Sequence, residues 1–339
     1  MSRKLITIST IMTLMSTSVI ADVPNVAADI APIHSLVSRV MDGVGAPKLI
    51  VQSGASPHGY RLRPSEAKAL QDADYVFWMG EELTPWLDSA IDTLATKASV
   101  TTLLDQEGVI LHDFREGVLF EAHDHSAHGD DDHDDHDDHD DHDDHKDHDD
   151  HDDHKDHDDH DDHDDHDDHG SHDPHAWLSP ENAKLWLNII ASKLSVSDPE
   201  NAATYFMNAA AGQAEIEAMI AEVKATLKPV QGGKFVVFHD AYQYFENDFD
   251  FYASGAISLG DSSDPSPARI EKVQKRIRDE GIQCVLAEPQ FKKGLVATVM
   301  EGSDATASVI DPLGAELETG PKLYTRLIKN MAKTLRNCL

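Results

Sequence analysis

Short apolar runs alternate with amphipathic segments along most of the chain. The apolar runs end in Gly, Pro or Asp, as buried strands commonly do, and they span residues 48–54, 75–80, 234–240, 283–290 and 307–314. Segments with helical periodicity lie between them, for example Pro64–Ala73 and Arg269–Glu280. Strands that alternate with helices predict an α/β fold with mainly parallel sheets, each covered by helices on both faces.

One helical segment is much longer than the others. It runs over residues 198–228, starts with Asp198 and Pro199, and contains no helix breaker except Gly212. A helix of about 30 residues is roughly 45 Å long, which exceeds the diameter of a small domain. We therefore expect this helix to join two lobes, an N-terminal lobe over 22–180 and a C-terminal lobe over 230–339.

The first residues have the pattern of a secretory signal peptide. Two basic residues precede an apolar stretch from Leu5 to Val19, and Val19 and Ala21 fit the small-residue cleavage rule. We expect residues 1–21 to be removed on export; the alternative is a buried N-terminal helix. No later stretch is long and apolar enough to span a membrane, so the mature protein is expected to be soluble.

Charge is concentrated in one segment of the 339-residue chain. Of the formal net charge of −35, residues 122–172 account for −24, with 26 Asp and two Lys, and the rest of the chain carries an ordinary −11. The sequence has no basic patch of the kind that would indicate nucleic acid or an anionic membrane as a partner. A strongly acidic field favours cations instead.

The same segment, here called the His/Asp tract (residues 122–172), repeats histidine at every third position. It has no apolar residue from Gly129 to Gly170, so we expect it to be disordered without metal. Histidines with nearby carboxylates offer partial coordination sets, which predicts auxiliary low-affinity metal sites; the alternative is an inert spacer. The histidines in question are His133, His136, His139, His142, His145, His148, His151, His154, His157, His160, His163, His166 and His169.

Histidine is scarce outside the tract, and three of the remaining residues occupy loop-like positions at element ends. His58 follows the run 48–52, His239 ends another run, and His175 precedes a helix predicted to begin near Pro180. Ligands of open α/β sheets bind beyond the carboxyl ends of strands, so these three side chains are candidate metal ligands. We expect the other two histidines to be surface or core residues, namely His34 and His112.

Two acidic residues occupy similar strand-end positions. Asp311 lies in "VIDPLG" and Glu288 in "LAEPQF". Asp311 is a candidate fourth ligand, although it could instead cap a turn. Glu288 could be an alternative ligand or a carboxylate that supports a ligand from behind.

The only cysteines are Cys284 and Cys338. In an exported protein such a pair is usually oxidised to a disulfide. Closing the loop of roughly 54 residues between them would stabilise the fold by about 4 kcal/mol. Two unpaired buried thiols are the alternative. Without a CxxC motif, we expect neither a thiolate metal site nor a redox centre.

Several separate motifs resemble one family along nearly the whole mature chain. In order they are "GASPHGYRLRPSEAKALQDADYVFWMG", "HAWLSPENA", "FVVFHDAYQYFE", "AEPQF" and "IDPLG". Together they resemble the zinc-specific, ZnuA-type periplasmic solute-binding proteins of ABC importers, in the metal-binding cluster A-I family. That resemblance implies two α/β lobes joined by a long helix, with metal bound in the cleft between the lobes.

The resemblance also implies roles for individual residues. It makes His58, His175 and His239 the imidazole ligands of Zn²⁺, and Asp311 the position that supplies a carboxylate in many members, while others use water. A His-rich insertion before the second ligand is another family feature, often much shorter than this one. The two cysteines match a pair that is disulfide-bonded in close relatives.

Simple ligand chemistry supports the choice of metal. Three imidazoles and one carboxylate favour zinc over manganese, with copper(II) and nickel as competitors. Because imidazole must lose its proton to bind metal, affinity should fall as the pH drops through about 6.5.

We therefore expect a periplasmic binding protein that captures Zn²⁺ and delivers it to an inner-membrane ABC permease with a cytoplasmic ATPase. The His/Asp tract would collect zinc at low affinity. We expect a monomer without a nucleic-acid partner, and a periplasmic zinc chaperone is a further candidate partner. One alternative is a zinc buffer or metallochaperone that serves no transporter. A zinc hydrolase is disfavoured, because the chain has no HExxH motif and no nucleophile elbow.

Overall fold

The computed structural model describes residues 23–115, 120, 172–258, 260, 265–290 and 293–339. The expected signal peptide and the tract histidines from His133 to His169 lie outside the described residues. The first sheet and its helices comprise β1 (Val26–Ala28), α1 (Ala31–Val40), β2 (Lys48–Leu49), α2 (Pro64–Gln71), β3 (Tyr75–Trp78), α3 (Pro85–Leu94) and β4 (Ser99–Thr102).

The chain then forms the short 3₁₀ helix η2 (Ala176–Leu178) and two longer helices, α4 (Pro180–Ser197) and α5 (Ala202–Leu227). After a second 3₁₀ turn, η3 (Lys228–Val230), it builds the second sheet and its helices. These are β5 (Phe235–His239), α6 (Gln243–Phe249), β6 (Ala256–Ser258), α7 (Pro267–Glu280), β7 (Cys284–Ala287), α8 (Lys293–Val299), β8 (Thr306–Val309) and α9 (Leu323–Cys338).

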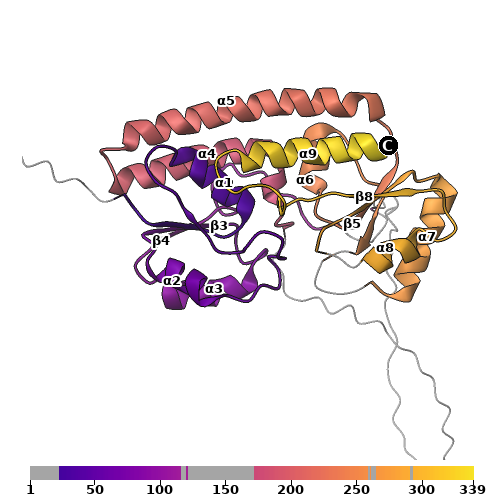
Figure 1. Cartoon of the computed structure of the whole chain (residues 1–339), viewed down its shortest axis with the longest axis horizontal. Coiled ribbons are helices and arrows are strands. Elements are labelled where there is room, and N and C mark those ends of the chain that lie inside the picture. The colour runs from indigo at the N-terminus through magenta and orange to yellow at the C-terminus, as the bar shows by residue number, and fades with distance from the viewer. Residues whose placement is uncertain (1–22, 116–119, 121–171, 259, 261–264, 291–292) are drawn as a thin grey trace, which may run out of the picture.

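Each lobe is built on a four-stranded sheet, and the two sheets have the same topology. The strand orders are β2-β1-β3-β4 and β6-β5-β7-β8, and every neighbouring pair is parallel. The predicted fold class, two mainly parallel α/β lobes joined by one long helix, is confirmed (Figure 1). The strands β1 (Val26–Ala28), β4 (Ser99–Thr102) and β6 (Ala256–Ser258) were not predicted from the sequence.

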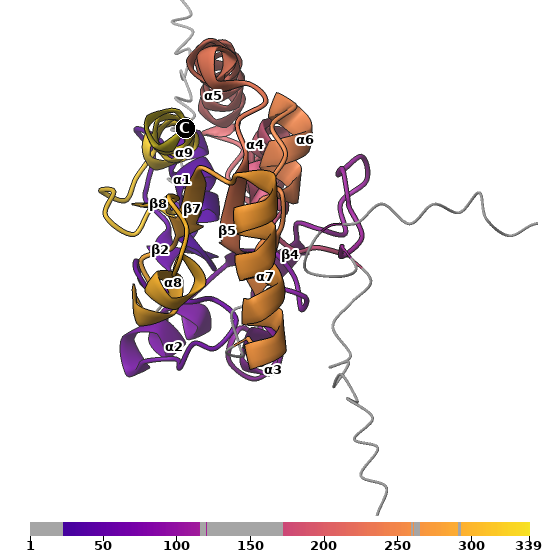
Figure 2. The same ribbon diagram turned by 90° about the vertical axis from the view of Figure 1, so that its right-hand side faces the viewer.

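Helices cover both faces of each sheet. One face of each sheet packs against α2 and α3 in one lobe and against α7 and α8 in the other, while α1, α4 and α9 lie on the other side of the molecule with α5 outermost (Figures 1 and 2). One cluster of buried apolar residues runs through these helices and both lobes, from Val26 to Leu335. The two lobes therefore share a core.

The long helix begins at Ala202, four residues later than the sequence predicts. The reason is that Asp198 ends α4 instead: its carboxylate accepts hydrogen bonds from Asn201 Nδ2 (2.7 Å) and the Tyr205 hydroxyl (2.8 Å). Within α5, Gly212 permits close packing. A Cβ atom there would lie 2.9 Å from a methyl group of Leu187 on α4.

The last helix ties the two lobes together. At its start, the Tyr324 amide donates to Ser35 Oγ of the first lobe (3.0 Å), and the Tyr324 hydroxyl donates to the Trp177 carbonyl (2.9 Å). At its end, Cys338 forms a disulfide with Cys284 on β7. Among the described residues, we find no helix with the length and hydrophobicity required to cross a membrane.

Removing this disulfide should lower stability. Replacing Cys284 and Cys338 with serine frees a loop whose ends are 54 residues apart, which should lower the free energy of unfolding by about 4 kcal/mol. Denaturant unfolding of the double variant, compared with wild type with and without reductant, measures the difference. Equal stability of the variant and oxidised wild type would contradict the expectation.

A second prediction concerns Asp29, whose side chain is fully buried at the end of β1. Burial raises the pKa of this carboxyl to about 7, although the amides of Ile30 and Met79 donate to it. The folded protein therefore holds a proton that the unfolded chain releases near pH 4, and the free energy of unfolding should fall as the pH rises from about 4 to 7. Asp29→Asn should remove roughly 4 kcal/mol of the change in the free energy of unfolding between pH 4 and 7. Denaturant unfolding of the metal-free proteins at several pH values measures the difference. The same pH dependence in both proteins would refute this.

Candidate metal centre

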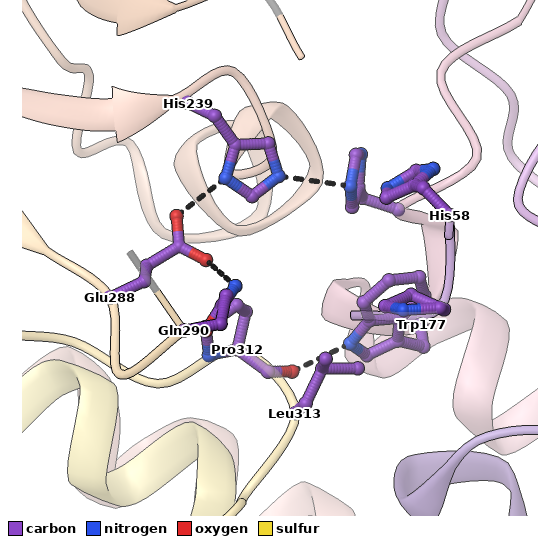
Figure 3. Close-up of a pocket in the computed structure, with 9 residues that line it drawn as sticks. His58, Trp177, His239, Glu288, Gln290, Pro312 and Leu313 are labelled. Carbon is purple, nitrogen blue, oxygen red and sulfur yellow. Dashed lines mark hydrogen bonds and ion pairs between the residues drawn. The ribbon is translucent and has the colours of Figure 1, made fainter. Parts of the chain in front are cut away.

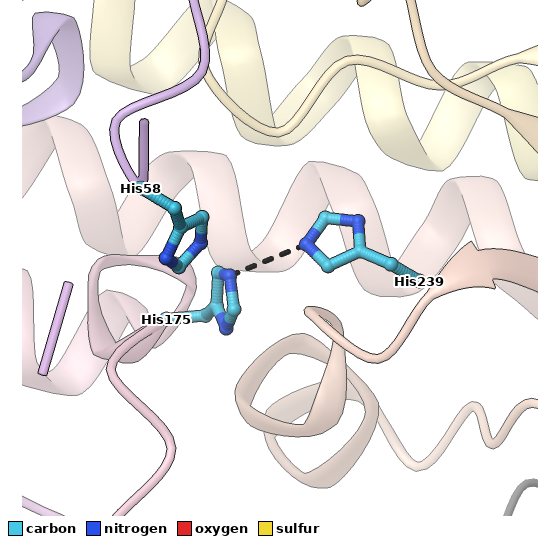
Figure 4. A group of neighbouring side chains, drawn as sticks. All are labelled: His58, His175 and His239. Carbon is cyan, nitrogen blue, oxygen red and sulfur yellow. Dashed lines mark hydrogen bonds between the residues drawn. The ribbon is translucent and has the colours of Figure 1, made fainter. Parts of the chain in front are cut away.

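Three histidines from distant parts of the chain meet between the lobes. One ring nitrogen from each of His58, His175 and His239 lies within 4.8 Å of one from each of the others. They form the one group of three or more potential metal-binding side chains found among the described residues. Figure 4 shows the rings of His58 and His175, from the first lobe, facing that of His239 at the end of β5.

His58 occupies the loop that follows β2. Its position depends on its neighbours, because the Trp86 indole donates to the Pro57 carbonyl (2.7 Å) and the His58 amide donates to Ser56 Oγ (3.3 Å). His58 is half-buried, whereas the other two histidines are buried, so its side of the cluster is the more accessible one.

His175 stands immediately before η2 and is oriented by a carboxylate. Asp173 Oδ1 lies 2.7 Å from the ring Nδ1 of His175 and also accepts from the His175 amide (2.9 Å). The Asp173 side chain is almost completely buried, and burial raises its pKa to about 6. With Nδ1 held by Asp173, Nε2 of His175 is the nitrogen directed into the cluster.

His239 is oriented in the same way from the second lobe. Its Nδ1 lies 2.6 Å from Glu288 Oε1, and the other carboxylate oxygen of Glu288 accepts from Gln290 Nε2 (2.7 Å), as Figure 3 shows. Glu288 follows β7, the strand next to β5 in the sheet. Carboxylates that bind the outer nitrogen of a metal-binding histidine fix its tautomer and make it more basic.

The distances suit a small tetrahedral ion. The Nε2 atoms of His175 and His239 are 3.4 Å apart. Nitrogen ligands about 2.0–2.1 Å from a tetrahedral Zn²⁺ are separated by about 3.4 Å. The ring nitrogen of His58 lies within 4.8 Å of these two, so a small movement of its side chain would complete the set.

Asp311 lies outside this group in the structure. Its carboxylate accepts hydrogen bonds from the amides of Leu313 (3.0 Å), Gly314 (2.8 Å) and Ala315 (2.6 Å), which is the turn-capping alternative considered above. The turn that it holds still contributes to the site, because Pro312 and Leu313 line the pocket around the histidines. No carboxylate other than Glu288 lines that pocket within the described residues.

The other two histidines outside the tract have different surroundings. His34 is buried in α1, with Nε2 3.2 Å from the Pro47 carbonyl, and burial lowers its pKa. His112 Nε2 contacts the Asn247 side chain (3.3 Å).

Two residues of the site were not singled out from the sequence. Asp173 lies only two residues before His175, in the sequence Asp-Pro-His, so this spacing could have indicated a supporting carboxylate. Trp177 packs against His175, with ring centroids 5.2 Å apart, and donates to the Pro312 carbonyl (2.8 Å) across the lobe boundary. Nothing in the sequence pattern distinguishes that tryptophan from one in a core.

Comparison with known proteins identifies the family. Residues 26–338 match the family model described as zinc-uptake complex component A, periplasmic. The chain belongs to the ZnuA family. The high-affinity zinc uptake system protein ZnuA of Brucella abortus (strain 2308) is 50% identical over 314 residues, which cover 93% of this chain and 91% of that protein. The protein of the same name from Paracoccus denitrificans is 45% identical over 320 residues, covering 94% and 93%.

Solved structures show the same fold. A crystal structure of ZnuA aligns with a TM-score of 0.68 at 20% identity, covering 94% of this chain and 99% of that one. A 138–173 deletion mutant of ZnuA with zinc bound also has a TM-score of 0.68 at 20% identity, covering 94% and 98%. The ZnuA family consists of periplasmic zinc-uptake binding proteins rather than enzymes, so this chain is a periplasmic zinc-uptake component.

The hydrogen bond behind His239 predicts a measurable effect. Glu288→Gln replaces a charged acceptor with a neutral amide, which should lower zinc affinity by about 10–100-fold. Competition titration against a zinc chelator measures this. Asp198→Asn is a matched control, because Asp198 is also fully buried but supports the junction of α4 and α5. It should lower stability without lowering affinity, and equal affinity losses in both variants would contradict the role of Glu288.

Proposed function

We propose that this ZnuA-family protein captures Zn²⁺ with the imidazoles of His58, His175 and His239. The observation that carries this proposal is the approach of these three side chains within 4.8 Å, with the Nδ1 atoms of two of them held by buried carboxylates. Asp311 is a possible source of a fourth ligand only if its turn rearranges, because its oxygens already accept three amide hydrogen bonds. Water therefore completes the coordination in this proposal.

In this proposal the protein is exported and works in the periplasm with a transporter as its partner. Residues 1–21 direct export and are cleaved, and the mature protein works as a monomer with lobes over 22–180 and 230–339. The shared name of the relatives, zinc uptake system protein, supports delivery of zinc to an ABC permease and its ATPase. A periplasmic zinc chaperone is a further proposed partner.

The His/Asp tract has a separate proposed role. Its histidines and carboxylates would bind zinc weakly and raise the local concentration of zinc near the cleft. This division of labour follows from chemistry: many equivalent Asp-Asp-His units offer no single defined geometry, whereas the three converging histidines do.

Calorimetry on a shortened protein tests both parts. Replacing residues 123–171 with a short linker retains His172, which contacts Asp113. This protein should keep one tight zinc site and lose the weak ones. In the same background, replacing any of His58, His175 or His239 with alanine should lower affinity by more than about 100-fold, which exceeds the usual effect of losing a supporting hydrogen bond.

His34→Ala serves as the control, because His34 is also a buried histidine but its ring contacts the Pro47 carbonyl rather than the cluster. It should retain one tight site. Loss of the tight site on tract removal would refute the division of labour. Intact tight binding after any of the three substitutions would refute the site itself.

A further inference from the structure

The chain segment before the His/Asp tract contacts the segment that begins with the last residue of the tract, His172. We call residues 109–115 and 172–175 the neck. Asp113 and His172 form an antiparallel bridge, with His172 Nδ1 2.8 Å from Asp113 Oδ1, and the Asp173 amide donates to the His112 carbonyl (2.8 Å). The neck therefore holds its own shape through contacts between its two segments.

Although the neck belongs to the first lobe in sequence, it packs against the second. The hydroxyl of Tyr244, a buried residue of α6, donates to the Asp173 carbonyl (2.7 Å) and accepts from the His112 amide (3.1 Å). A single tyrosine of the second lobe thus contacts both segments of the neck.

Arg115 makes the strongest connection between the neck and the second lobe. Its Nε lies 3.0 Å from both carboxylate oxygens of Asp240, its Nη2 also contacts Asp240, and its Nη1 donates to Glu246 Oε2 (2.6 Å). The side chains of Arg115, Asp240 and Glu246 are only 16%, 7% and 1% exposed, so this is a buried ion-pair network. The guanidinium also stacks on the Phe120 ring, 3.6 Å from its centroid.

The network and the neck each adjoin a different histidine of the metal centre. Asp240 directly follows His239 in the chain, and Asp173 of the neck holds Nδ1 of His175. The neck thus contains Asp173, which supports His175, and is bound through Arg115 to Asp240, the residue next to His239. A planar guanidinium with several fixed donors restricts both the position and the orientation of its carboxylate partners.

We propose that Arg115 is a positioning residue, which sets His239 against His175 by clamping Asp240 to the neck. This inference rests on the proposed function of the three histidines. Stability alone is a poor reason for the network, because the desolvation of buried ion pairs offsets much of their attraction and apolar replacements are often equally stable. Fixing the register of two packed parts is the better attested use of such groups.

Three variants of the mature full-length protein test this role. Arg115→Lys keeps the charge but loses the planar fork, Arg115→Met removes both, and Arg115→Met combined with Asp240→Asn and Glu246→Gln leaves no unpaired buried charge. Zinc affinity is measured by competition with a chelator that outcompetes weak sites. One equivalent of Co²⁺ reports geometry through its visible absorption, and thermal unfolding reports stability.

We expect Arg115→Lys and the triple variant to unfold near the wild-type temperature, yet to bind zinc about 10–100-fold more weakly, with altered Co²⁺ spectra. Arg115→Met should show the same affinity loss together with lower stability. Arg39→Met is the matched control, since Arg39 forms a partly buried two-bond ion pair with Glu215 between α1 and α5. It should lower the unfolding temperature but leave affinity and the spectrum unchanged.

Wild-type affinity and spectra in Arg115→Lys and the triple variant would overturn the positioning role. An affinity loss in Arg39→Met as large as in the Arg115 variants would overturn it too, because affinity would then follow stability. Absence of a tight site in wild type would refute the proposed function, and this inference with it.

Discussion

The candidate metal centre depends on two buried hydrogen bonds, one in each lobe. Asp173 holds His175 and Glu288 holds His239, each through Nδ1, so that the two Nε2 atoms face one another 3.4 Å apart. An isolated carboxylate at such depth would be strongly disfavoured, and so would an imidazole with no partner. In each pair the carboxylate and the imidazole give one another a hydrogen-bond partner. Because the pairing uses Nδ1, it also makes Nε2 the nitrogen that faces the candidate metal position.

Because the two pairs belong to different lobes, the placement of the lobes sets the distance between the nitrogens. Several elements fix that placement together. The helix α5 packs along both lobes, α9 is anchored at one end to Ser35 and at the other by the disulfide, and one apolar core is common to both lobes. The apolar contacts are nonspecific in direction compared with the hydrogen bonds at the site. The polar contacts of Trp177 with Pro312 and of Arg115 with Asp240 add directional constraints across the same boundary.

Much of this architecture could be predicted from the sequence, for identifiable reasons. Apolar runs that end in turn residues predicted the central strands, and the lack of breakers predicted the long helix. His58 and His239 could be anticipated as candidate ligands because each follows or ends a strand, and ligands of open α/β sheets bind beyond the carboxyl ends of strands. The grouping of both with His175, across two sheets, was implied by the family resemblance. Their role as zinc ligands stays a prediction.

What could not be predicted depends on side-chain hydrogen bonds that only the folded chain defines. The start of α5 depends on the hydrogen bonds of Asp198 with Asn201 and Tyr205, which no local propensity encodes. The turn held by Asp311 is set by three amides whose direction only the folded loop defines. The partnership of Arg115 with Asp240 joins residues 125 positions apart, and nothing in either local sequence indicates the other.

The closed neck has an evolutionary consequence. The entropic cost of closing a flexible loop grows only logarithmically with the length of the loop. Each doubling of that length costs about 0.6 kcal/mol. Since Asp113, His172 and Asp173 seal the neck independently of what lies between them, Asp-Asp-His triplets can be gained or lost by duplication with little effect on the fold. The length of the tract can thus vary while the arrangement of the three histidines is inherited unchanged.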